Sequence, residues 1–316
     1  MRILITGANG FVGRKLCKTL SQAGHHITAM TYKEYSSPVQ ADEHVQCDIR
    51  DASALEAAVK IISPSHVIHL AALTHIPTSF ENVQLTWQVN AMGSLHLFEA
   101  LRRNAPNAFT LFVSSSEVYG ASFKQGLPLS EGAYCAPLNP YAASKLAAET
   151  AFLSALRRGL RGIIARPFNH IGPGQSTDFV ASSFAQQIAL IEGGKQPPII
   201  KVGNLEAYRD FLDVEDVCQA YAKLLLVNER DDLPPCINIC SGRPRKIEEI
   251  LEMLLSLSPT IITIQPEPSR MRPSEIPYAA GNNERLRTMT GWRATRDLPS
   301  TLSSLLEYWR AEASLQ

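Results

Sequence analysis

Apolar residues in the first half of the chain follow two alternating patterns, and each pattern predicts a different element. Short runs rich in β-branched residues predict buried strands, whereas longer stretches with apolar residues three or four positions apart predict helices. The chain opens with such a run at 2–6, and the stretch at 11–23 then has helical spacing until Gly24. Further strands are predicted at 26–32, 44–47, 66–70, 110–114 and 162–165, and further helices at 52–62, 83–104 and 140–158.

This regular order of strand and helix predicts an α/β fold with a doubly wound parallel sheet, helices on both faces and right-handed crossovers. After Arg166 the order breaks, because proline and glycine become frequent and long turns separate the predicted helices at 179–191 and 247–257. We therefore expect a first domain at 1–166 and a smaller lobe mainly at 167–316. Segments around 205–230 are expected to return to the first domain, so that the two interleave.

Composition narrows the class of protein. The 316 residues include 30 Lys and Arg and 30 Asp and Glu, and this balance argues against a nucleic-acid or membrane-surface partner. No apolar run reaches the roughly 18 residues of a membrane span, and no charged leader opens the chain, so we expect a cytoplasmic protein. The six cysteines are scattered, which predicts reduced thiols. Cys236 and Cys240 share a face of a probable strand, but a metal would need two further ligands, so no metal site is expected.

A glycine-rich turn joins the first predicted strand to the first helix, with the spacing G-x-x-G-x-x-G. Such a turn brings backbone close to a pyrophosphate, and free amides at the start of the helix then face the anion. Gly13 also lets the helix pack tightly on the strand. The turn therefore predicts a dinucleotide site in a Rossmann-type fold. Its expected residues are Gly7, Asn9, Gly10, Phe11, Val12 and Gly13.

The end of the second predicted strand bears on the choice of nicotinamide cofactor. An acid there would bind a ribose 2′-hydroxyl, whereas a basic residue tolerates a 2′-phosphate. The strand ends near Tyr32 and Lys33, and Glu34 is expected to lie beyond it, so NADP(H) is favoured and NAD(H) is the alternative. Asp48 and Ile49 follow the third strand. Asp48 is expected either to accept a hydrogen bond from the adenine amino group or to cap a turn or helix.

Tyr141 and Lys145 are four residues apart in the predicted helix 140–158 and therefore share a face. A free phenol titrates near about 10, and a nearby ammonium is expected to lower that pKa toward neutrality. The preceding strand ends in the run SSSE at 114–117, at the sheet edge where ligands bind. We expect Ser115 to orient a carbonyl, Tyr141 to transfer the proton and Lys145 to tune the acidity of Tyr141.

The glycine turn, the serine run and the Tyr-x-x-x-Lys helix together resemble the short-chain dehydrogenase/reductase superfamily. The stretches LAAL at 70–73, SSSEVYG at 114–120 and NPYAASK at 139–145 are similar to its extended branch, which contains nucleotide-sugar epimerases, dehydratases and reductases. The resemblance implies that Asn90 supports the catalytic helix at the cofactor site. It also implies that the cofactor is lined by Leu70, Ala71, Ala72 and Arg166.

Three stretches of the second half, ARPFNHIGPGQ, KVGNLEAYRDFLDVEDV and RMRPSEIP, are similar to the GDP-mannose dehydratase and GDP-4-keto-6-deoxy-mannose reductase group. This resemblance implies a GDP-sugar substrate. Guanidinium groups pair bidentately with phosphate oxygens, and Arg209 and Arg272 lie in polar contexts that suit a nucleoside diphosphate. Asn169 is expected to bond the diphosphate or sugar, Glu275 a guanine or ribose donor, and Ser116 the substrate. Surface salt bridges or loop structure are the alternatives for these residues.

Three functions are compatible with these residues. A reductase would transfer hydride from NADPH to carbon 4 of a 4-keto-6-deoxy sugar while Tyr141 protonates the alkoxide. A 4,6-dehydratase or epimerase would need a further base and acid, which Glu117 with Ser115 or Ser116 offers. A non-catalytic NADP-binding sensor would have no need of the intact Ser/Tyr/Lys set. The overall match favours the reductase, and related proteins imply a homodimer paired through helices 83–104 and 140–158.

Overall fold

The computed structural model describes residues 1–33, 39–227, 232–270 and 276–315, and within them the main element is a seven-stranded parallel sheet. Its strand order is β3-β2-β1-β4-β5-β6-β10, so the winding reverses between β1 and β4. The doubly wound, Rossmann-type fold expected from the sequence is confirmed. The strands are β1 (Arg2–Thr6), β2 (His26–Thr31), β3 (Glu43–Gln46), β4 (His66–His69), β5 (Phe109–Val113), β6 (Arg161–Pro167) and β10 (Cys236–Ile239).

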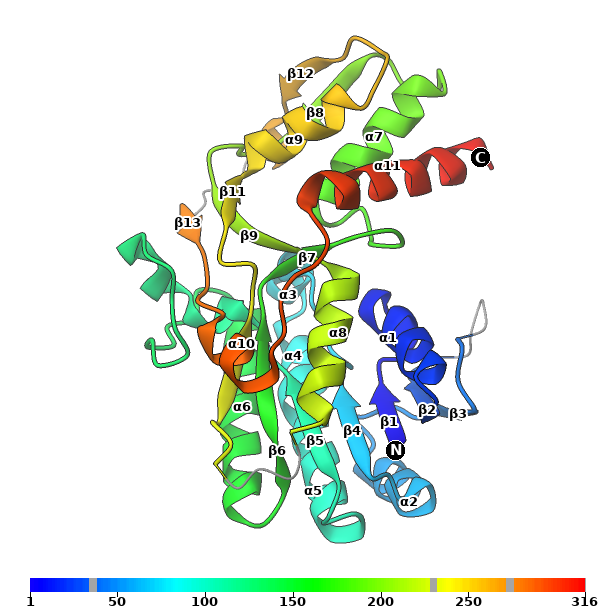
Figure 1. Ribbon diagram of the computed structural model, residues 1–316, viewed down its shortest axis with the longest axis vertical. Coiled ribbons are helices and arrows are strands. Elements are labelled where there is room, and N and C mark those ends of the chain that lie inside the picture. The colour runs from blue at the N-terminus through cyan, green and yellow to red at the C-terminus, as the bar shows by residue number, and fades with distance from the viewer. Residues whose placement is uncertain (34–38, 228–231, 271–275, 316) are drawn as a thin grey trace.

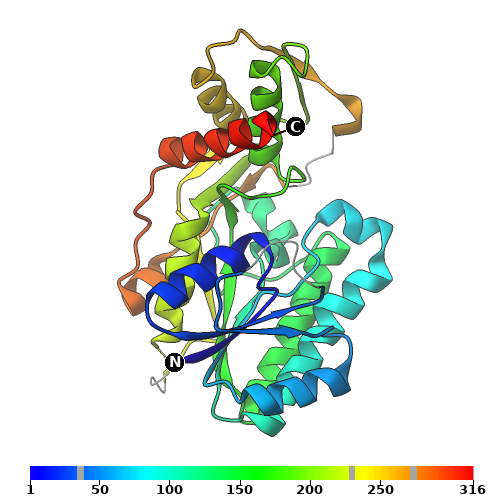
Figure 2. The same ribbon diagram turned by 90° about the vertical axis from the view of Figure 1, so that its right-hand side faces the viewer.

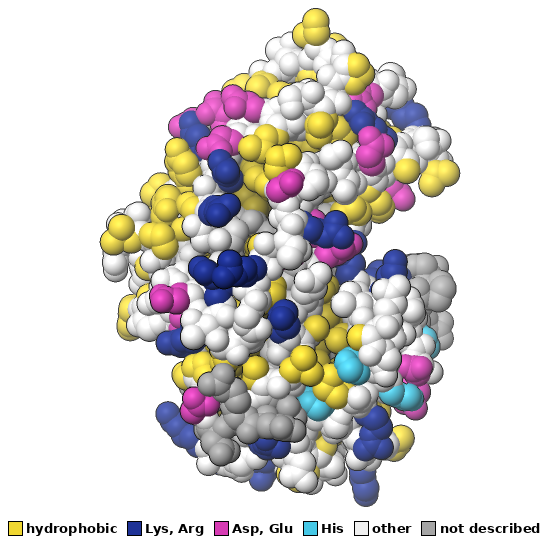
Figure 3. All heavy atoms as spheres, viewed as in Figure 1, with side chains coloured by type: hydrophobic (Ala, Val, Ile, Leu, Met, Phe, Trp, Pro, Cys, Tyr) yellow, Lys and Arg dark blue, Asp and Glu magenta, His cyan; other side chains and the backbone are white. Residues whose placement is uncertain are grey.

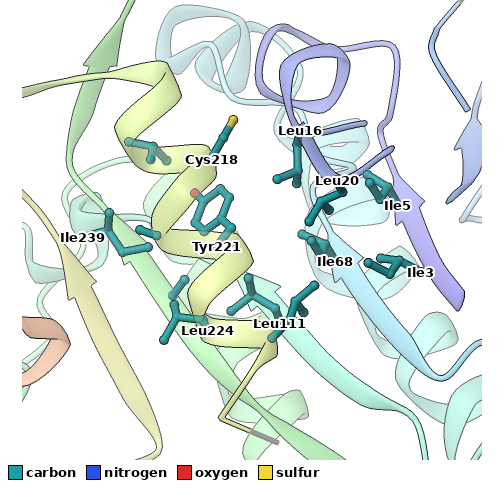
Figure 4. Packing of buried hydrophobic residues seen from close by; sticks show 14 of the residues in the cluster. Ile3, Ile5, Leu16, Leu20, Ile68, Leu111, Cys218, Tyr221, Leu224 and Ile239 are labelled. Atoms are coloured by element: carbon teal, nitrogen blue, oxygen red, sulfur yellow. The ribbon is translucent and has the colours of Figure 1, made fainter. Parts of the chain in front are cut away.

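Side chains of this sheet alternate between two helical layers. Along β1, Ile3 and Ile5 pack with the layer that contains α1 and α8, whereas Leu4 packs with the opposite layer. Figure 4 shows the first layer, in which Leu16 and Tyr221 pack over the sheet. That layer consists of α1 (Phe11–Gln22), α8 (Val214–Leu225) and α10 (Glu284–Thr290). The other consists of α2 (Ala52–Ile62), α5 (Ser94–Asn104) and α6 (Pro140–Arg157), with α3 (Ile76–Glu81) and α4 (Val83–Trp87) beside α6.

A smaller lobe lies beyond the carboxyl edge of the sheet (Figures 1 and 2). Its core joins three helices to a small sheet in which β9 pairs antiparallel with β11 and parallel with β7 and β13. The helices are α7 (Val180–Glu192), α9 (Ile247–Ser256) and α11 (Leu298–Ser314). The strands are β7 (Asn169–Ile171), β8 (Ile199–Val202), β9 (Tyr208–Asp213), β11 (Pro244–Lys246), β12 (Thr263–Pro266) and β13 (Tyr278–Ala279). The 3₁₀ turns are η2 (Ser116–Tyr119), η3 (Ala121–Gln125) and η4 (Pro268–Arg270).

The chain passes between the two lobes several times. Within the segment 205–230 that the sequence assigned to the first domain, α8 packs on the larger sheet, but β9 belongs to the small one. Beyond that segment, β10 and α10 also join the larger lobe. The smaller lobe is therefore built from separate pieces of chain, each inserted at the carboxyl edge of the larger sheet.

The continuous helix expected at 83–104 is interrupted by a π-helical turn, η1 (Gln88–Gly93), between α4 and α5. The turn buries Asn90, whose side chain accepts from the Leu73 amide at 2.8 Å and donates to Ser144 Oγ at 3.0 Å. A Cβ on Gly93 would lie 2.7 Å from the side chain of Ile49, so glycine allows the close approach. Single π-turns inside helices occur frequently at functional sites, and regular apolar spacing does not reveal them.

The structure also bears on the expected state of the cysteines, on metal binding and on membrane spans. All six cysteines are free thiols. Cys236 packs beneath the large sheet, whereas Cys240 lies beyond the end of β10 in a separate apolar cluster, so the two do not share a face of one strand. Among the described residues, no cluster of three His, Cys, Asp or Glu side chains is arranged to hold a metal ion. Over the same stretches of chain, none of the helices combines the length and apolarity that a bilayer crossing requires.

The packing of α5 on the sheet generates a stability prediction. Leu101 is 0% exposed, so Leu101→Ala should lower the free energy of unfolding by about 2–5 kcal/mol through lost burial and the cavity left behind. The matched variant Leu226→Ala, at a residue that is 68% exposed, should change it by no more than about 0.5 kcal/mol. Urea unfolding of both variants measures the difference, and equal costs would contradict this assignment of the core.

Candidate active site

The glycine turn lies where β1 ends and α1 begins, next to the end of β4. Gly7 has φ 68°, and a Cβ on it would lie 2.8 Å from the Ala71 amide nitrogen. A Cβ on Gly13 would lie 2.4 Å from the Gly7 carbonyl oxygen. Gly10 donates its amide to that same carbonyl at 3.0 Å. The close packing of β1, α1 and the segment after β4 therefore depends on glycine at these positions.

The first turn of α1 presents backbone amides that no side chain caps. Gly10 is the N-cap, and the amides of Phe11, Val12 and Gly13 precede the first residue that has an intrahelical acceptor. Asn9 lies exposed beside them. Such amides, together with the positive end of the helix dipole, attract phosphate groups. The residues present therefore fit the pyrophosphate of a dinucleotide at this edge of the sheet.

Two basic side chains gather at the end of β2. Tyr32 and Lys33 are exposed there, and Lys33 Nζ lies 5.8 Å from the centroid of the Tyr32 ring. Arg50, which the sequence did not suggest, lies against the same ring with its guanidinium carbon 5.5 Å from the centroid. Its Nη2 donates to the Tyr32 phenol oxygen at 3.4 Å. Glu34, the acid that bears on cofactor choice, lies outside the described residues.

Asp48 is engaged by its own turn. Its carboxylate accepts from the Arg50 amide at 3.0 Å and from Arg50 Nη2 at 2.6 Å, and the guanidinium lowers the pKa of the Asp48 carboxyl. Of the two expectations for Asp48, this geometry corresponds to the turn and not to a free adenine ligand. Asp51 caps α2 instead, accepting from the Ser53 amide at 3.1 Å. Ile49, between these acids, packs against η1.

The segment after β4 runs along the glycine turn. Leu70, Ala71 and Ala72 are half-buried there. The Leu70 amide donates to the Thr6 carbonyl and the Ala71 amide to Thr6 Oγ1, both at 3.2 Å. His69 was missed because it lies in the apolar run of β4. Its ring nitrogens lie 2.7 Å from Thr6 Oγ1 and 2.9 Å from Ser94 Oγ, and burial lowers the pKa of His69 to about 3. A neutral His69 therefore ties β1, β4 and α5 together below the site.

Tyr141 lies in the first turn of α6, where its side chain faces the end of β5. The residue is only 7% exposed, and the Ser115 hydroxyl lies close enough to its phenol to affect the phenol's pKa. Burial raises the pKa of Tyr141 to about 12, the Ser115 hydroxyl opposes that rise, and the charge of Glu117 adds to it. The phenol is therefore protonated at pH 7. The arrangement can deliver a proton to an oxygen atom placed beside both hydroxyls.

Lys145 lies one turn further along α6. Its Nζ donates to the Val113 carbonyl at 2.6 Å and lies 4.8 Å from the centroid of the Phe112 ring. Burial lowers the pKa of Lys145 to about 8, while the charge of Glu149 raises it. We expected this ammonium to bring the pKa of Tyr141 below its usual value. The pKa of Tyr141 instead lies above that value because the phenol is buried, and the side chains that act on it are Ser115 and Glu117.

Glu117 joins the site from the turn after β5. Asn139 donates to its Oε2 at 3.3 Å and also caps α6, with Oδ1 accepting from the Ala142 amide at 2.7 Å. Burial raises the pKa of Glu117, whereas the charge of Arg209 and the bond from Asn139 lower it. Arg209 donates to the Ile276 carbonyl at 3.0 Å. The sequence named Arg209 and Glu117 for different roles, but the structure brings their charges together. Asn139 is recognisable in retrospect as an N-cap before Pro140.

The other residues expected to bind substrate are placed unequally. Ser116 is buried at the start of η2, beside Ser115. Asn169 is exposed at the start of β7 and is paired in register with Phe211 of β9, two residues from Arg209. Arg272 and Glu275 lie outside the described residues. The described part of the candidate substrate site is therefore the group formed by η2, α6, β7 and β9.

Arg166 was expected at the cofactor site, but its guanidinium is held in a buried ion pair. Its Nη2 and Nε donate to the two carboxylate oxygens of Glu149 at 2.6 and 2.9 Å, and its Cζ lies 4.9 Å from the centroid of the Tyr119 ring. The pair raises the pKa of Arg166. Because both edges of the fork are engaged, Arg166 joins β6 to α6 instead of presenting a free cation to a ligand. Glu149 is spaced one helical turn after Lys145, a signal that the sequence reading did not use.

Comparison with known proteins agrees with this geometry. Residues 3–240 match the model of the NAD dependent epimerase/dehydratase family. The chain is 37% identical to a GDP-6-deoxy-D-mannose reductase from Pseudomonas aeruginosa over 98% of this chain and 97% of that protein. It is 29% identical to a GDP-mannose 4,6-dehydratase from Yersinia enterocolitica over 80% of this chain and 70% of that protein.

Solved structures give the same result. RMD from Pseudomonas aeruginosa complexed with NADPH superposes with a TM-score of 0.86 at 34% identity, covering 99% of this chain and 100% of that one. A Thermus thermophilus UDP-glucose 4-epimerase complex with NAD has a TM-score of 0.84 at 26% identity, covering 98% and 99%. The protein is thus an NAD(P)-dependent oxidoreductase with a Rossmann-type sheet. It belongs to the NAD dependent epimerase/dehydratase family, the extended branch of the short-chain dehydrogenases/reductases.

Proposed function

We propose that this enzyme reduces the 4-keto group of a GDP-4-keto-6-deoxy-sugar, converting GDP-4-keto-6-deoxy-D-mannose to GDP-D-rhamnose with NADPH. The observation that carries the proposal is the 37% identity, over nearly the whole length of both chains, to a GDP-6-deoxy-D-mannose reductase. The site is consistent with it. A reductase needs a proton donor beside the substrate carbonyl, and Tyr141 is a buried, protonated phenol beside Ser115.

Protonation of Tyr141 favours reduction over dehydration. When bound, NADPH supplies the hydride to carbon 4. Ser115 orients the carbonyl oxygen, and Tyr141 protonates that oxygen as negative charge develops on it. Lys145 is charged below its pKa of about 8, and this charge stabilises the phenolate that forms when Tyr141 gives up its proton. A dehydratase would begin by removing a proton from a sugar hydroxyl, and a phenol with a pKa of about 12 is a poor base for that step at neutral pH.

The substrate groups are proposed to bind along η2 and β9. Arg209 supplies a cation for the diphosphate, and Asn169 a hydrogen-bonding amide next to it. Arg272 and Glu275, which the sequence also indicated as substrate-binding residues, belong to the same proposed site. Glu117, held by Asn139 and close to Arg209, lies on the sugar side, where it shapes the polarity around carbons 4 and 6.

The cofactor preference proposed here is NADPH over NADH. Lys33 and Arg50 bring two cations to the Tyr32 ring, where the adenosine ribose of a dinucleotide on α1 would lie. A 2′-phosphate would find two donors there, whereas a 2′-hydroxyl would gain little from either.

A cytoplasmic homodimer is also part of the proposal. Free thiols at all six cysteines are typical of proteins in a reducing compartment. Val83, Trp87 and Met92 are 45%, 40% and 47% exposed along α4 and η1, so the helical stretch 83–104 offers apolar surface to a second copy.

Two substrates separate the reductase from its alternatives. With GDP-4-keto-6-deoxy-D-mannose, the protein should oxidise NADPH stoichiometrically. With GDP-mannose and NADP⁺, it should form no 4-keto product. Absorbance of NADPH and chromatography of the nucleotide sugars measure both reactions. A 4-keto product formed from GDP-mannose without added reductant would establish a dehydratase, and inactivity toward both substrates would favour a cofactor-binding sensor.

Tyr141→Phe should lower turnover by about 10²–10⁴-fold with NADPH binding retained, and Tyr134→Phe, at an exposed residue, should not.

The cofactor preference is tested by removing the cations one at a time. Arg50→Ala and Lys33→Ala should each raise KM for NADPH about tenfold or more, because a charge-assisted hydrogen bond to the 2′-phosphate is lost. KM for NADH should stay within about twofold, which makes NADH the internal control. Steady-state kinetics with both cofactors measures this. An equal loss for both cofactors would show that Arg50 acts only by holding Asp48.

A further inference from the structure

A second concave surface lies apart from the catalytic cleft. It is a pocket of about 570 Å³ at the junction of the two lobes, between β9, the loop before β11, α10 and the start of α11. Its volume falls in the range of small-molecule sites. Among the described residues, its lining shares none with the group around Tyr141. Figure 3 shows Lys and Arg side chains gathered across the middle of this face.

Five arginines line this pocket: Arg243, Arg245, Arg287, Arg293 and Arg296. All five are exposed, and they come from three separate parts of the chain. Arg245 pairs with Glu249 at 3.4 Å, and Arg296 pairs with Glu215. In the part of the chain that the structure describes, no acid pairs with Arg243, Arg287 or Arg293. Three guanidinium groups thus line one pocket without an ion-pair partner among the described residues.

Two acids, Asp213 and Asp297, also line the pocket, where five arginines outnumber them, and each also stabilises a helix terminus. Asp213 accepts from the Glu215 amide at 2.7 Å and from Thr301 Oγ1 at 2.8 Å. Asp297 caps α11, accepting from the Ser300 amide at 2.8 Å. Mutual repulsion of convergent cations is relieved when an anion binds between them, and the planar guanidinium fork matches phosphate oxygens bidentately.

We propose that this pocket is a second ligand site, which binds a small molecule that carries a diphosphate. Three unpaired guanidiniums match the charge of a diphosphate better than that of a single phosphate. The apolar side chains of Met253, Leu298 and Pro299, which also line the pocket, would contact the organic part of the ligand. Because α10 packs on the large sheet and β11 and α11 belong to the small lobe, the bound anion connects the two lobes.

Inorganic pyrophosphate titrated into the full-length, NADPH-saturated protein tests the proposal by calorimetry. Wild type should bind it, and Arg243→Gln/Arg287→Gln should weaken that binding about tenfold or more. The charge-matched control Arg103→Gln/Arg158→Gln, at exposed arginines of α5 and the end of α6, should bind as wild type does. Arg293→Gln is the second pocket variant, should the double variant fail to fold. Thermal melts check that each variant is folded.

Two results would overturn the proposal. Undetectable binding at millimolar pyrophosphate would remove the site, and equal affinity in wild type and both pocket variants would assign the binding to another surface. Inorganic phosphate in the same titration tests the choice of ligand. It should bind at least about tenfold more weakly than pyrophosphate, since it engages fewer of the guanidiniums. Equal affinities would contradict the assignment to a diphosphate.

Discussion

The proposed chemistry depends on one buried group, the Tyr141 phenol, which lies beside the Ser115 hydroxyl. Removing the phenol from water favours its neutral form, so the residue is kept as an acid and not as a base. A single proton donor without charge, placed next to a second hydroxyl, suits a reaction that turns a carbonyl into an alcohol. In the proposed mechanism Lys145, whose Nζ donates to the Val113 carbonyl at 2.6 Å, stabilises the phenolate that forms as the phenol gives up its proton.

The fold brings these two hydroxyls together by supporting α6 at several points. Asn139 caps the helix and holds Glu117, while Asn90 reaches from the π-turn to Ser144 one turn beyond Tyr141. Deeper in the helix, the bidentate pair of Glu149 with Arg166 fastens it to β6. Each support is a buried polar contact, and each costs free energy if one partner is lost. The position of the phenol therefore depends on residues from four separate elements.

Much of this arrangement could be read from the sequence, and the limits have physical reasons. The apolar periods of strands and helices predicted how these elements alternate along the chain, and glycine spacing located the turn, because those features are local. Gly7 and Gly13 could be recognised since only glycine permits that packing. The π-turn around Asn90 was missed because it breaks the helix without breaking the apolar pattern. The pairing of Arg166 with Glu149 was not predicted, because Glu149 lies 17 residues away in the chain and on another element.

Electrostatic results were harder to predict than positions. From spacing alone, Lys145 should lower the pKa of Tyr141, but burial of the phenol raises that pKa to about 12. For Asp48 the sequence left an adenine ligand and a turn or cap residue as alternatives, and the structure pairs its carboxylate with Arg50 of the same turn. For Tyr141 and for Asp48, the neighbouring residues could be identified from the sequence. The burial of the phenol and the direction of the Arg50 side chain could not.

The pH dependence of reduction tests the central claim most directly. At saturating NADPH, kcat/KM for the 4-keto sugar should be flat in the acidic range and fall as pH rises through about 8. Tyr141 stays protonated over that range, while Lys145 loses the charge that stabilises the phenolate formed during proton transfer. Lys145→Met should lower the rate and remove that fall. A rate that rises with pH across the same interval would mean that the phenolate is the active form, and would contradict the account.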